Sequence, residues 1–218
     1  MNHTVIQRSK AFFSKPFFHD QRTILALWML LSVVAMVLKL NRSDNNFRIF
    51  RGVFWHTIEG LPLYEAYPAE YFDINHYGPF FSIVIAPFAV MPVWLGILLW
   101  NIALSLTLYF AISRSGFQYG QKLFLFWFCS ETLLTSLFMQ QFNITIAAII
   151  IASFFLIEKE RDFWAAFLII LGTLVKLYGV VGLAFFLFSR HKIRFTLSLL
   201  FWALLLFAAP MLISSPQY

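Results

Sequence analysis

Ionisable side chains gather in one part of an otherwise apolar sequence, the polar stretch of residues 41–78. Its charged residues are Arg42, Asp44, Arg48, Arg51, Glu59, Glu65, Glu70 and Asp73. His56, His76 and several tyrosines lie among them. Carboxylates and imidazoles can transfer protons, and guanidinium groups bind anions through paired hydrogen bonds. Any chemistry that the protein performs is therefore expected to be organised around this stretch.

The rest of the chain has the composition of a membrane protein. It has 218 residues, of which 61% are hydrophobic and 12% charged, and its mean hydropathy is +0.77. A water-soluble domain needs more polar surface than this. The formal net charge is +6, but the basic residues stand between apolar runs, where they set membrane orientation, so no nucleic acid partner is expected. A lone Cys129 and five scattered histidines predict no disulfide framework, no metal site and no cofactor.

The apolar runs are candidates for membrane helices. They are residues 23–40, 79–91, 93–112, 122–139, 144–157, 163–175, 177–188 and 195–213. A full span needs about 20 residues, and the runs on either side of Lys176 are shorter. Short helices at membrane depth are tolerated where they line a cavity in the protein. The run 79–91 contains Pro87 and is followed by Pro92, so we expect a re-entrant or interfacial helix there.

The distribution of lysine and arginine predicts the topology. The segments 1–22, 114–122, 158–162 and 189–194 together hold 11 of the 16 Lys and Arg residues, and the positive-inside rule places such segments in the cytoplasm. This arrangement requires that the run 79–91 does not cross.

The sequence thus predicts an all-α, polytopic protein of the plasma (inner) membrane, with about seven transmembrane helices and additional amphipathic or re-entrant helices. Residues 1–22 form a cytoplasmic N-terminus, residues 23–213 a single membrane domain, and residues 214–218 a short C-terminal end. The polar stretch 41–78 is expected outside the cytoplasm.

A helix is predicted over residues 46–59 of the polar stretch. Apolar residues recur there at helical spacing: Phe47, Phe50, Phe54, Ile58 and Leu61. The opposite stripe contains Arg48, Gly52, His56 and Glu59. Such an amphipathic helix is expected on the membrane surface, with its apolar face toward the lipid and its polar face toward solvent or a cavity.

A series of short motifs resembles glycosyltransferase family 87, the polyprenol-phosphate-sugar-dependent, mannosyltransferase-like proteins of the GT-C superfamily. These motifs are Asn46-Phe47-Arg48-Ile49-Phe50, Gly60-Leu61-Pro62-Leu63-Tyr64, Tyr77-Gly78-Pro79, Ala86-Pro87 through Pro92, Leu99-Trp100-Asn101, Gln141-Phe142-Asn143 and Lys176-Leu177-Tyr178. The resemblance begins near residue 44. Asn46 stands where the family has its acidic residue, and the nearest acid is Asp44. Members of the family look about twice as long, so we expect a truncated N-terminal half.

The resemblance implies a GT-C-like fold in the lipid bilayer and a hexosyltransferase activity. A mannosyl-like group would pass from a polyprenyl-phosphate sugar to a glycolipid or glycan acceptor on the extracytoplasmic side. Such a transfer needs a general base near the acceptor hydroxyl and cations that stabilise the departing lipid phosphate. Two alternatives are a non-catalytic transporter or flippase-like protein and an inactive half-enzyme.

Asp44 is the first candidate for the base and Asp73 the second. Either carboxylate could instead serve local structure, Asp44 as a helix N-cap and Asp73 in an Asx turn. Lys176 is expected to bind the lipid phosphate, with Arg48 and Arg51 assisting, although these cations could also reach only lipid headgroups. The remaining substrate-binding candidates are His76, Tyr77, Gln141 and Asn143.

Overall fold

The computed structural model describes residues 14–40 and 42–214, which contain helices and no strand. In chain order the elements are η1 (Pro16–His19), α2 (Gln21–Lys39), α3 (Asn45–Glu59), α4 (Phe81–Ala89), α5 (Val93–Ser113), α6 (Tyr119–Phe138), α7 (Asn143–Glu158), α8 (Asp162–Val175), η2 (Leu177–Leu187), α9 (Lys192–Ala208) and η3 (Ala209–Leu212). The predicted all-α fold is confirmed.

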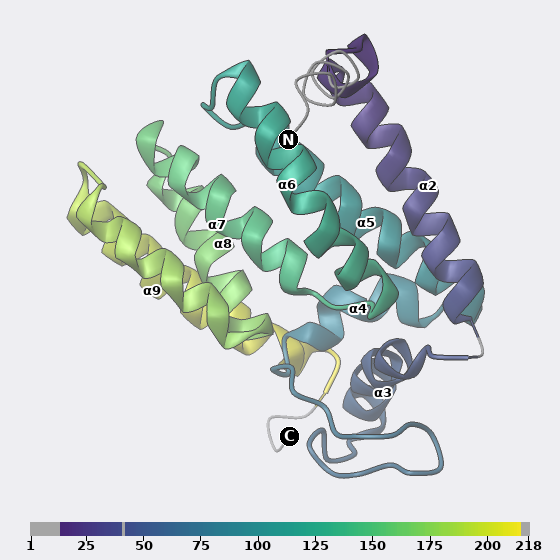
Figure 1. Cartoon of the computed structure of the whole chain (residues 1–218). Helices are drawn as coiled ribbons and strands as arrows, with labels where there is room; N and C mark the ends of the chain where they lie inside the picture. Colours follow the sequence, from purple (N-terminus) through teal and green to yellow (C-terminus); the bar gives the residue numbers. More distant parts are fainter. Residues whose placement is uncertain (1–13, 41, 215–218) are drawn as a thin grey trace.

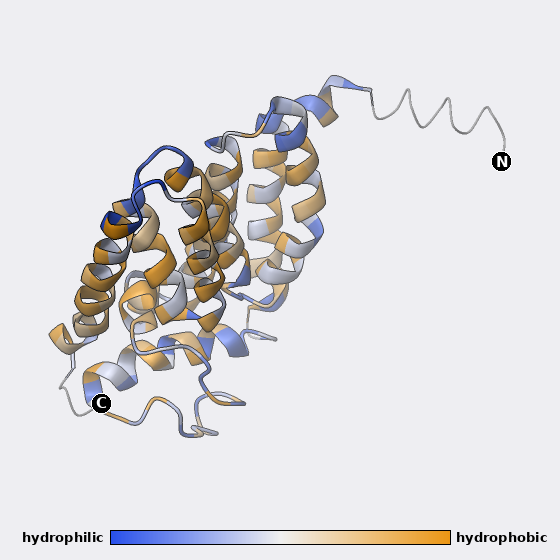
Figure 2. Cartoon of the chain, turned by 90° about the vertical axis from the view of Figure 1, so that its left-hand side faces the viewer, coloured by the Kyte–Doolittle hydropathy of each residue, from blue (hydrophilic) through white to orange (hydrophobic). Residues whose placement is uncertain are grey.

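The long helices form a bundle in which successive elements alternate in direction (Figure 1). At one end, which we call the basic end, Trp127 Nε1 donates to the carbonyl of Phe18 at 3.0 Å, and Arg190 pairs with Glu160 at 2.9 Å. The opposite end, which we call the loop end, carries α3, α4 and the loop from Gly60 to Phe80. Hydrophilic residues collect at both ends and hydrophobic residues fill the middle (Figure 2).

Within residues 14–40 and 42–214, three helices are long and apolar enough to cross a membrane: Gln21–Lys39, Val93–Ser113 and Lys192–Leu212. The apolar helices Asn143–Glu158, Asp162–Val175 and Leu177–Leu187 are shorter. These helices make the chain a membrane protein, while the count of about seven spans stays a prediction. Helix α4 has nine residues and is about 14 Å long, too short to cross a hydrocarbon core of about 30 Å.

The short apolar run after Lys176 forms a 3₁₀ helix, η2. Because a 3₁₀ helix rises more per residue than an α-helix, η2 can match the length of α8 with fewer residues. Its 11 residues rise about 2.0 Å each, so η2 is about 22 Å long, close to the 21 Å or so of the 14-residue α8. The two elements pack closely because glycines face each other: a Cβ on Gly179 would overlap the backbone of Gly172 and Thr173. The side chain of Ile169 occupies the space above Gly182.

Small polar side chains connect the apolar helices in the core. Ser32 Oγ of α2 bonds to Ser105 Oγ of α5 at 2.9 Å, and Trp28 Nε1 of α2 donates to Ser130 Oγ of α6 at the same distance. Hydrogen bonds of this kind hold helices together where the surrounding lipid is as apolar as the side chains. They fix α2 against both α5 and α6.

Replacement of Gly179 by alanine tests the close packing of α8 and η2. The added methyl group would overlap backbone atoms, so we expect Gly179→Ala to destabilise the protein by about 1–3 kcal/mol. The measurement is the thermal unfolding midpoint of the detergent-solubilised protein. Gly120→Ala is the matched control, because Gly120 has no atom within 4 Å of the added Cβ. Equal midpoints for the two variants would contradict this packing.

Candidate functional site

Helix α3 is docked against the protein by its apolar stripe. Phe47 is fully buried and lies against Gly96 of α5. The ring of Phe50 contacts Tyr77 and Phe81 edge-on, at centroid distances of 4.9 and 5.0 Å. The expectation that this face rests on lipid is therefore wrong for Phe47, Phe50 and Phe54, which are all buried. Helix α4 and the start of α5 cover Phe47 and Phe50. Only Ile58 and Leu61 of the stripe are exposed.

The polar stripe of α3 is also partly covered, so the expectation that it faces solvent or a cavity is wrong for Gly52 and His56. The Tyr71 ring lies directly over Gly52, where a Cβ would meet Tyr71 Cε1 at 2.7 Å. The His56 ring is buried under Tyr67, with centroids 4.0 Å apart, and its Nε2 lies 3.1 Å from Glu70 Oε2. This His56–Glu70 pair was not predicted, because no local spacing relates the two residues.

The N-terminus of α3 carries an ion pair. Arg48 Nε donates to Asp44 Oδ1 at 3.0 Å, and Arg48 Nη2 lies 3.4 Å from Asp44 Oδ2. The Asp44 side chain is 6% exposed and that of Arg48 is 48% exposed. Asp44 occupies the N-cap position but makes no side-chain capping bond. Its carboxylate is thus committed to Arg48, not to the helix terminus.

Asn46, at the position of the family's acidic residue, has a structural partner. Its Nδ2 donates to the carbonyl of Met139 at 2.7 Å, across the C-terminal end of α6. An aspartate could not make this bond, because a carboxylate has no hydrogen to donate. Asn46 therefore ties α3 to the α6–α7 turn. The acidic residue nearest to it in the sequence is Asp44, two positions earlier.

Lys176 is the centre of a second group of predicted residues. Its Nζ donates to Asn143 Oδ1 at 2.7 Å, and Asn143 Nδ2 donates to Gln141 Oε1 at 2.9 Å. The rings of Tyr77 and Tyr178 each have their centroid 5.3 Å from Nζ, within cation–π range. Four of the predicted residues, Tyr77, Gln141, Asn143 and Lys176, are thus brought together.

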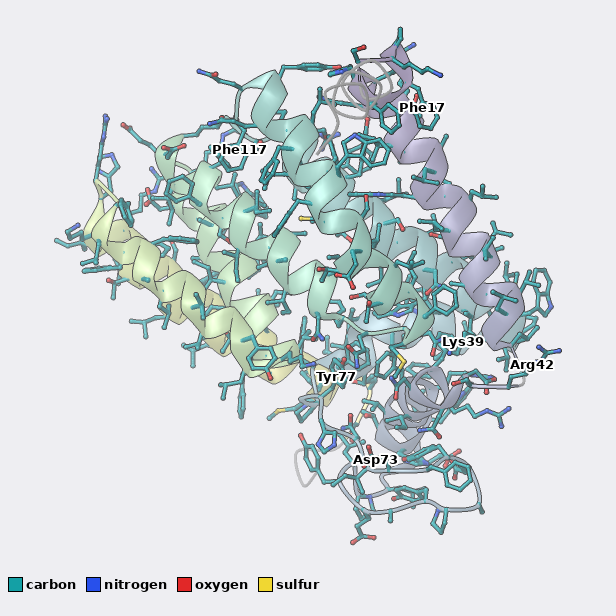
Figure 3. All side chains as sticks on the ribbon, in the orientation of Figure 1. Phe17, Lys39, Arg42, Asp73, Tyr77 and Phe117 are labelled. Atoms are coloured by element: carbon teal, nitrogen blue, oxygen red, sulfur yellow. The ribbon has the colours of Figure 1, made fainter. Side chains whose placement is uncertain are left out.

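The chain between α8 and η2 leaves helical geometry at Lys176, where φ is −150° and ψ is 126°. The amide of Gly78 donates to the carbonyl of Val175 at 3.3 Å, which joins the loop to this break. A Cβ on Gly78 would overlap the carbonyl oxygen of Leu174, so only glycine permits the approach. Tyr77 is placed beside Lys176 as a result. Figure 3 shows Tyr77 where the loop meets the loop end of the bundle.

Tyr77 is held rigidly in this position. Asn75 closes a local turn, because its Nδ2 donates to the Tyr77 carbonyl and its Oδ1 accepts from the Tyr77 amide, both at 2.9 Å. The Tyr77 ring stacks on Phe81 at 4.4 Å, and its hydroxyl accepts from the Phe142 amide at 3.5 Å. Burial raises the pKa of Tyr77 to about 12, although the bond from Phe142 lowers it. Tyr77 is therefore a neutral neighbour of Lys176.

The charge on Lys176 is not neutralised by a carboxylate in the described residues. Asn143 is the only hydrogen-bond partner of Nζ within residues 14–40 and 42–214, and an ammonium group has three donors. Lys176 lies between two helices, and burial lowers the pKa of its ammonium group. A partly buried cation with unused donors is suited to bind a phosphate oxygen.

The α6–α7 turn links the two groups. Asn46, next to the Asp44–Arg48 pair, bonds to Met139 at the start of the turn, and Lys176 bonds to Asn143 at its end. Within the turn, the carbonyl of Gln140 accepts from Trp100 Nε1 at 2.8 Å, and Gln140 has a positive φ of 50°. We call six residues the outer site: Tyr77, Gln141, Asn143 and Lys176, which are linked by direct contacts, and the ion pair of Asp44 and Arg48, which is joined to the turn only through the neighbouring Asn46.

Three predicted residues lie apart from the outer site. Arg51 Nε donates to the carbonyl of Ala89 at 3.1 Å, so Arg51 holds α3 against the end of α4. Asp73 has a positive φ of 76°, and its Oδ1 accepts from the Ile74 amide at 2.8 Å. His76 lies 3.9 Å from Asp73, and both side chains are about two-thirds exposed. The contacts of Asp73 are those of a turn residue.

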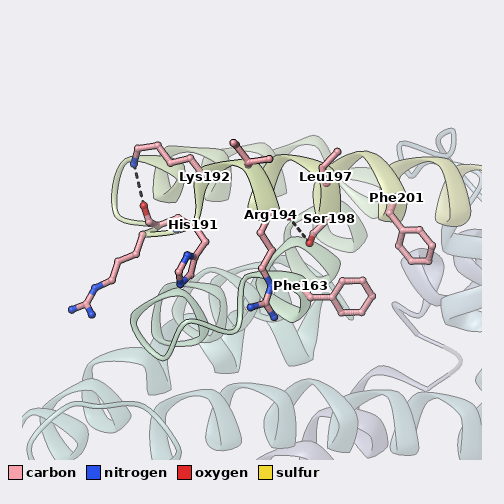
Figure 4. Close-up of a pocket in the computed structure, with 10 residues that line it drawn as sticks. Phe163, His191, Lys192, Arg194, Leu197, Ser198 and Phe201 are labelled. Carbon is pink, nitrogen blue, oxygen red and sulfur yellow. Dashed lines mark hydrogen bonds between the residues drawn. The ribbon is translucent and has the colours of Figure 1, made fainter.

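The cavities of the protein differ in size between its two ends. Near the outer site, a cavity of about 120 Å³ is lined by Pro79, Phe80 and Leu174. A cavity of about 1030 Å³ lies at the basic end beside Arg194 and Phe163 (Figure 4). A third, of about 560 Å³, lies between α5 and α7. Among the described residues, no group of three or more His, Cys, Asp and Glu side chains could hold a metal ion.

The Asn46→Asp variant tests the structural role of Asn46. The new carboxylate would face the Met139 carbonyl without a hydrogen to donate, so we expect a loss of about 0.5–1.5 kcal/mol of stability, the usual net contribution of a solvent-accessible hydrogen bond. The measurement is again the unfolding midpoint in detergent. Asn46→Ala removes the donor without adding a charge and should cost less. An Asn46→Asp protein as stable as the wild type would contradict the proposed bond.

The sequence profile described as glycosyltransferase family 87 matches residues 75–218. No curated protein and no solved structure matches the chain. The matched range includes His76, Tyr77, Gln141, Asn143 and Lys176. Asp44, Arg48, Arg51 and Asp73 precede it, so the resemblance predicted from residue 44 is matched only from residue 75.

Proposed function

The chain belongs to glycosyltransferase family 87 and is a membrane glycosyltransferase, and we propose that it transfers a mannose-like hexosyl group from a polyprenyl-phosphate sugar to a glycolipid or glycan acceptor. The observation that carries the proposal is the ammonium group of Lys176, which has unused donors and no carboxylate partner in the described part of the chain. An anionic leaving group would complete its coordination.

We propose that the loop end faces the extracytoplasmic side of the plasma membrane and that the N-terminus is cytoplasmic. The basic residues support this orientation, because Arg114, Lys159, Arg161 and the 190–194 segment all lie near the opposite end. Loops rich in Lys and Arg are retained in the cytoplasm. The outer site then opens toward the leaflet from which a lipid-linked sugar would be taken.

In the proposed reaction, Lys176 stabilises the phosphate that leaves. The acceptor oxygen attacks the anomeric carbon, the bond from that carbon to the phosphate oxygen breaks, and the phosphate departs with the electron pair. The Lys176 ammonium, within reach of Tyr77 and Asn143, offsets the developing charge. Arg48 is the second candidate for a phosphate contact, because its guanidinium is about half exposed.

Asp44 is the proposed general base, which takes the proton from the acceptor hydroxyl. One observation supports Asp44 over Asp73: it lies two residues from Asn46, which contacts the α6–α7 turn. The ion pair with Arg48 orients the carboxylate. Gln141 and Asn143 are proposed to bind sugar hydroxyls, with His76 at the exposed edge.

The test is transfer of labelled mannose from a polyprenyl-phosphate mannose donor to endogenous acceptors in membranes that contain the full chain. We expect Asp44→Asn to lower the rate about 10²- to 10⁴-fold through loss of the base. Lys176→Gln should lower it about 10²- to 10³-fold through loss of charge stabilisation. Glu59→Gln is the matched control, since Glu59 is an exposed carboxylate at the far end of α3.

The transfer rates of these variants distinguish between the proposed catalytic site, the two candidate bases and a flippase-like function. Wild-type rates in both Asp44→Asn and Lys176→Gln would overturn the outer site as the catalytic site. A loss in Asp73→Asn without a loss in Asp44→Asn would move the base to Asp73. Donor-dependent movement of lipid-linked sugar without transfer would favour a flippase-like protein.

The pH dependence provides a second test. Burial lowers the pKa of Lys176, so its charged form is present at low pH and is lost as the pH rises through that lowered pKa. Transfer should therefore fall on the alkaline side, before an ordinary lysine would lose its proton. Lys176→Arg should keep part of the activity and move this fall to higher pH, because arginine stays protonated. An unchanged alkaline limb in Lys176→Arg would contradict the role of Lys176.

A further inference from the structure

The cavity between α5 and α7 combines an apolar channel with a basic mouth. Its volume is about 560 Å³, within the range of about 300–1,000 Å³ that is usual for sites that bind small molecules. It extends from the middle of the bundle to the basic end. It shares no residue with the outer site, so it does not depend on the proposed transfer reaction.

Small side chains on both helices create the channel. On α5, Ala103, Thr107 and Ala111 line it, and on α7, Ala148 and Ala152 do. These residues recur at intervals of four, so each set lies along one face of its helix. Because alanine fills little space, the two helices enclose a channel where larger side chains would have closed it.

Each of these stripes ends in a basic residue three helical turns beyond its first alanine. Arg114 follows Ala103 by 11 residues, and Lys159 follows Ala148 by 11 residues. At 1.5 Å per residue this gives a channel about 16 Å long. One leaflet contributes half of a hydrocarbon core of about 30 Å, so the channel has the depth of a single leaflet.

The mouth is positively charged, and no acidic residue that the structure describes pairs with it. Arg114, Lys159 and Arg161 line it, and none of them pairs with a carboxylate in the described part of the chain. The Arg114 guanidinium lies 4.8 Å from the centroid of the Phe110 ring, on the channel wall. Two nearby acids do not line the cavity: Glu160 pairs with Arg190, and the buried Asp162 accepts from Ser189 through Oδ1, while its Oδ2 has no hydrogen-bond partner among the described residues. Glu158 does not line the cavity.

We propose that this cavity binds an anionic phospholipid of the leaflet that faces the basic end. One acyl chain lies between α5 and α7, and the lipid phosphate lies among Arg114, Lys159 and Arg161. Charge complementarity favours an anionic headgroup, because guanidinium groups bind phosphate in a bidentate manner. The length of the channel favours an acyl chain of one leaflet over the longer chain of a polyprenyl phosphate.

The test uses the full chain in detergent, with lipid retention measured by native mass spectrometry. The probes are phosphatidylglycerol and phosphatidylcholine with identical acyl chains. We expect the wild type to retain phosphatidylglycerol in preference. Each of Arg114→Gln, Lys159→Gln and Arg161→Gln should weaken retention about fivefold, the effect of removing one cation near an anionic headgroup.

Two further variants make the test specific. Ala152→Trp fills the channel without changing charge and should reduce retention of phosphatidylglycerol. Arg194→Gln removes a cation at the same end that lines a different cavity, and it should leave retention unchanged. Equal retention of the two lipids, equal losses in Arg194→Gln and Arg114→Gln, or no effect of Ala152→Trp would each overturn the proposal.

Competition with two other phosphate compounds tests which kind of phosphate-bearing ligand the cavity binds. Neither polyprenyl phosphate nor inorganic phosphate at equal concentration should displace phosphatidylglycerol. Displacement by polyprenyl phosphate would assign the cavity to a carrier lipid and overturn the phospholipid assignment. Displacement by inorganic phosphate would reduce the site to a simple anion site. Because none of these readouts involves sugar transfer, failure of this proposal is distinguishable from failure of the proposed function.

Discussion

At Lys176 the backbone leaves helical geometry within an apolar bundle, and its polar groups must still find partners. The carbonyl of Val175 accepts from Gly78 in the loop, and the amide of Lys176 donates to the carbonyl of Gly172. An unpaired backbone group in such surroundings would cost several kcal/mol. The break is therefore possible only because the loop docks against it, and the same docking places Tyr77 over the Lys176 ammonium. The hydrogen bond from Gly78 to Val175 therefore both supports the backbone break and fixes the position of Tyr77 beside Lys176.

The docking also explains why the loop end is compact. Helix α3 buries its phenylalanines against α4 and α5. The side chains of Asn46 and Arg51 donate hydrogen bonds to the carbonyls of Met139 and Ala89. Both carbonyls lie at helix C-terminal ends, where backbone acceptors lack partners within the helix. Asn46 and Arg51 of α3 thus provide hydrogen-bond donors for backbone carbonyls at the C-terminal ends of α6 and α4. The ion pair of Asp44 and Arg48 and the cluster at Lys176 are the residues that we propose for the transfer reaction.

Much of the fold could be predicted from the sequence, because hydropathy and helical spacing are local properties. They indicated a helix over residues 46–59, and the structure has α3 from Asn45 to Glu59. They could not indicate which surface that helix meets, since an apolar stripe fits lipid and protein equally well. The contact of Lys176 with Asn143 joins residues 33 apart, and only the packing of α7 against α8 brings them together. His56 and Glu70 could not be paired from the sequence for the same reason.

The bond from Asn46 to Met139 joins residues 93 positions apart, and this has a consequence for biogenesis. A chain inserted from its N-terminus cannot close the loop end when α3 emerges, because α6 has not yet been synthesised. The Gly78 contact waits longer still, until α8 is in place. Contacts of such long sequence separation form slowly and after local ones. The outer site is therefore assembled late in insertion, and a nascent chain that has not yet completed α8 carries its charged residues without the geometry that would let them act.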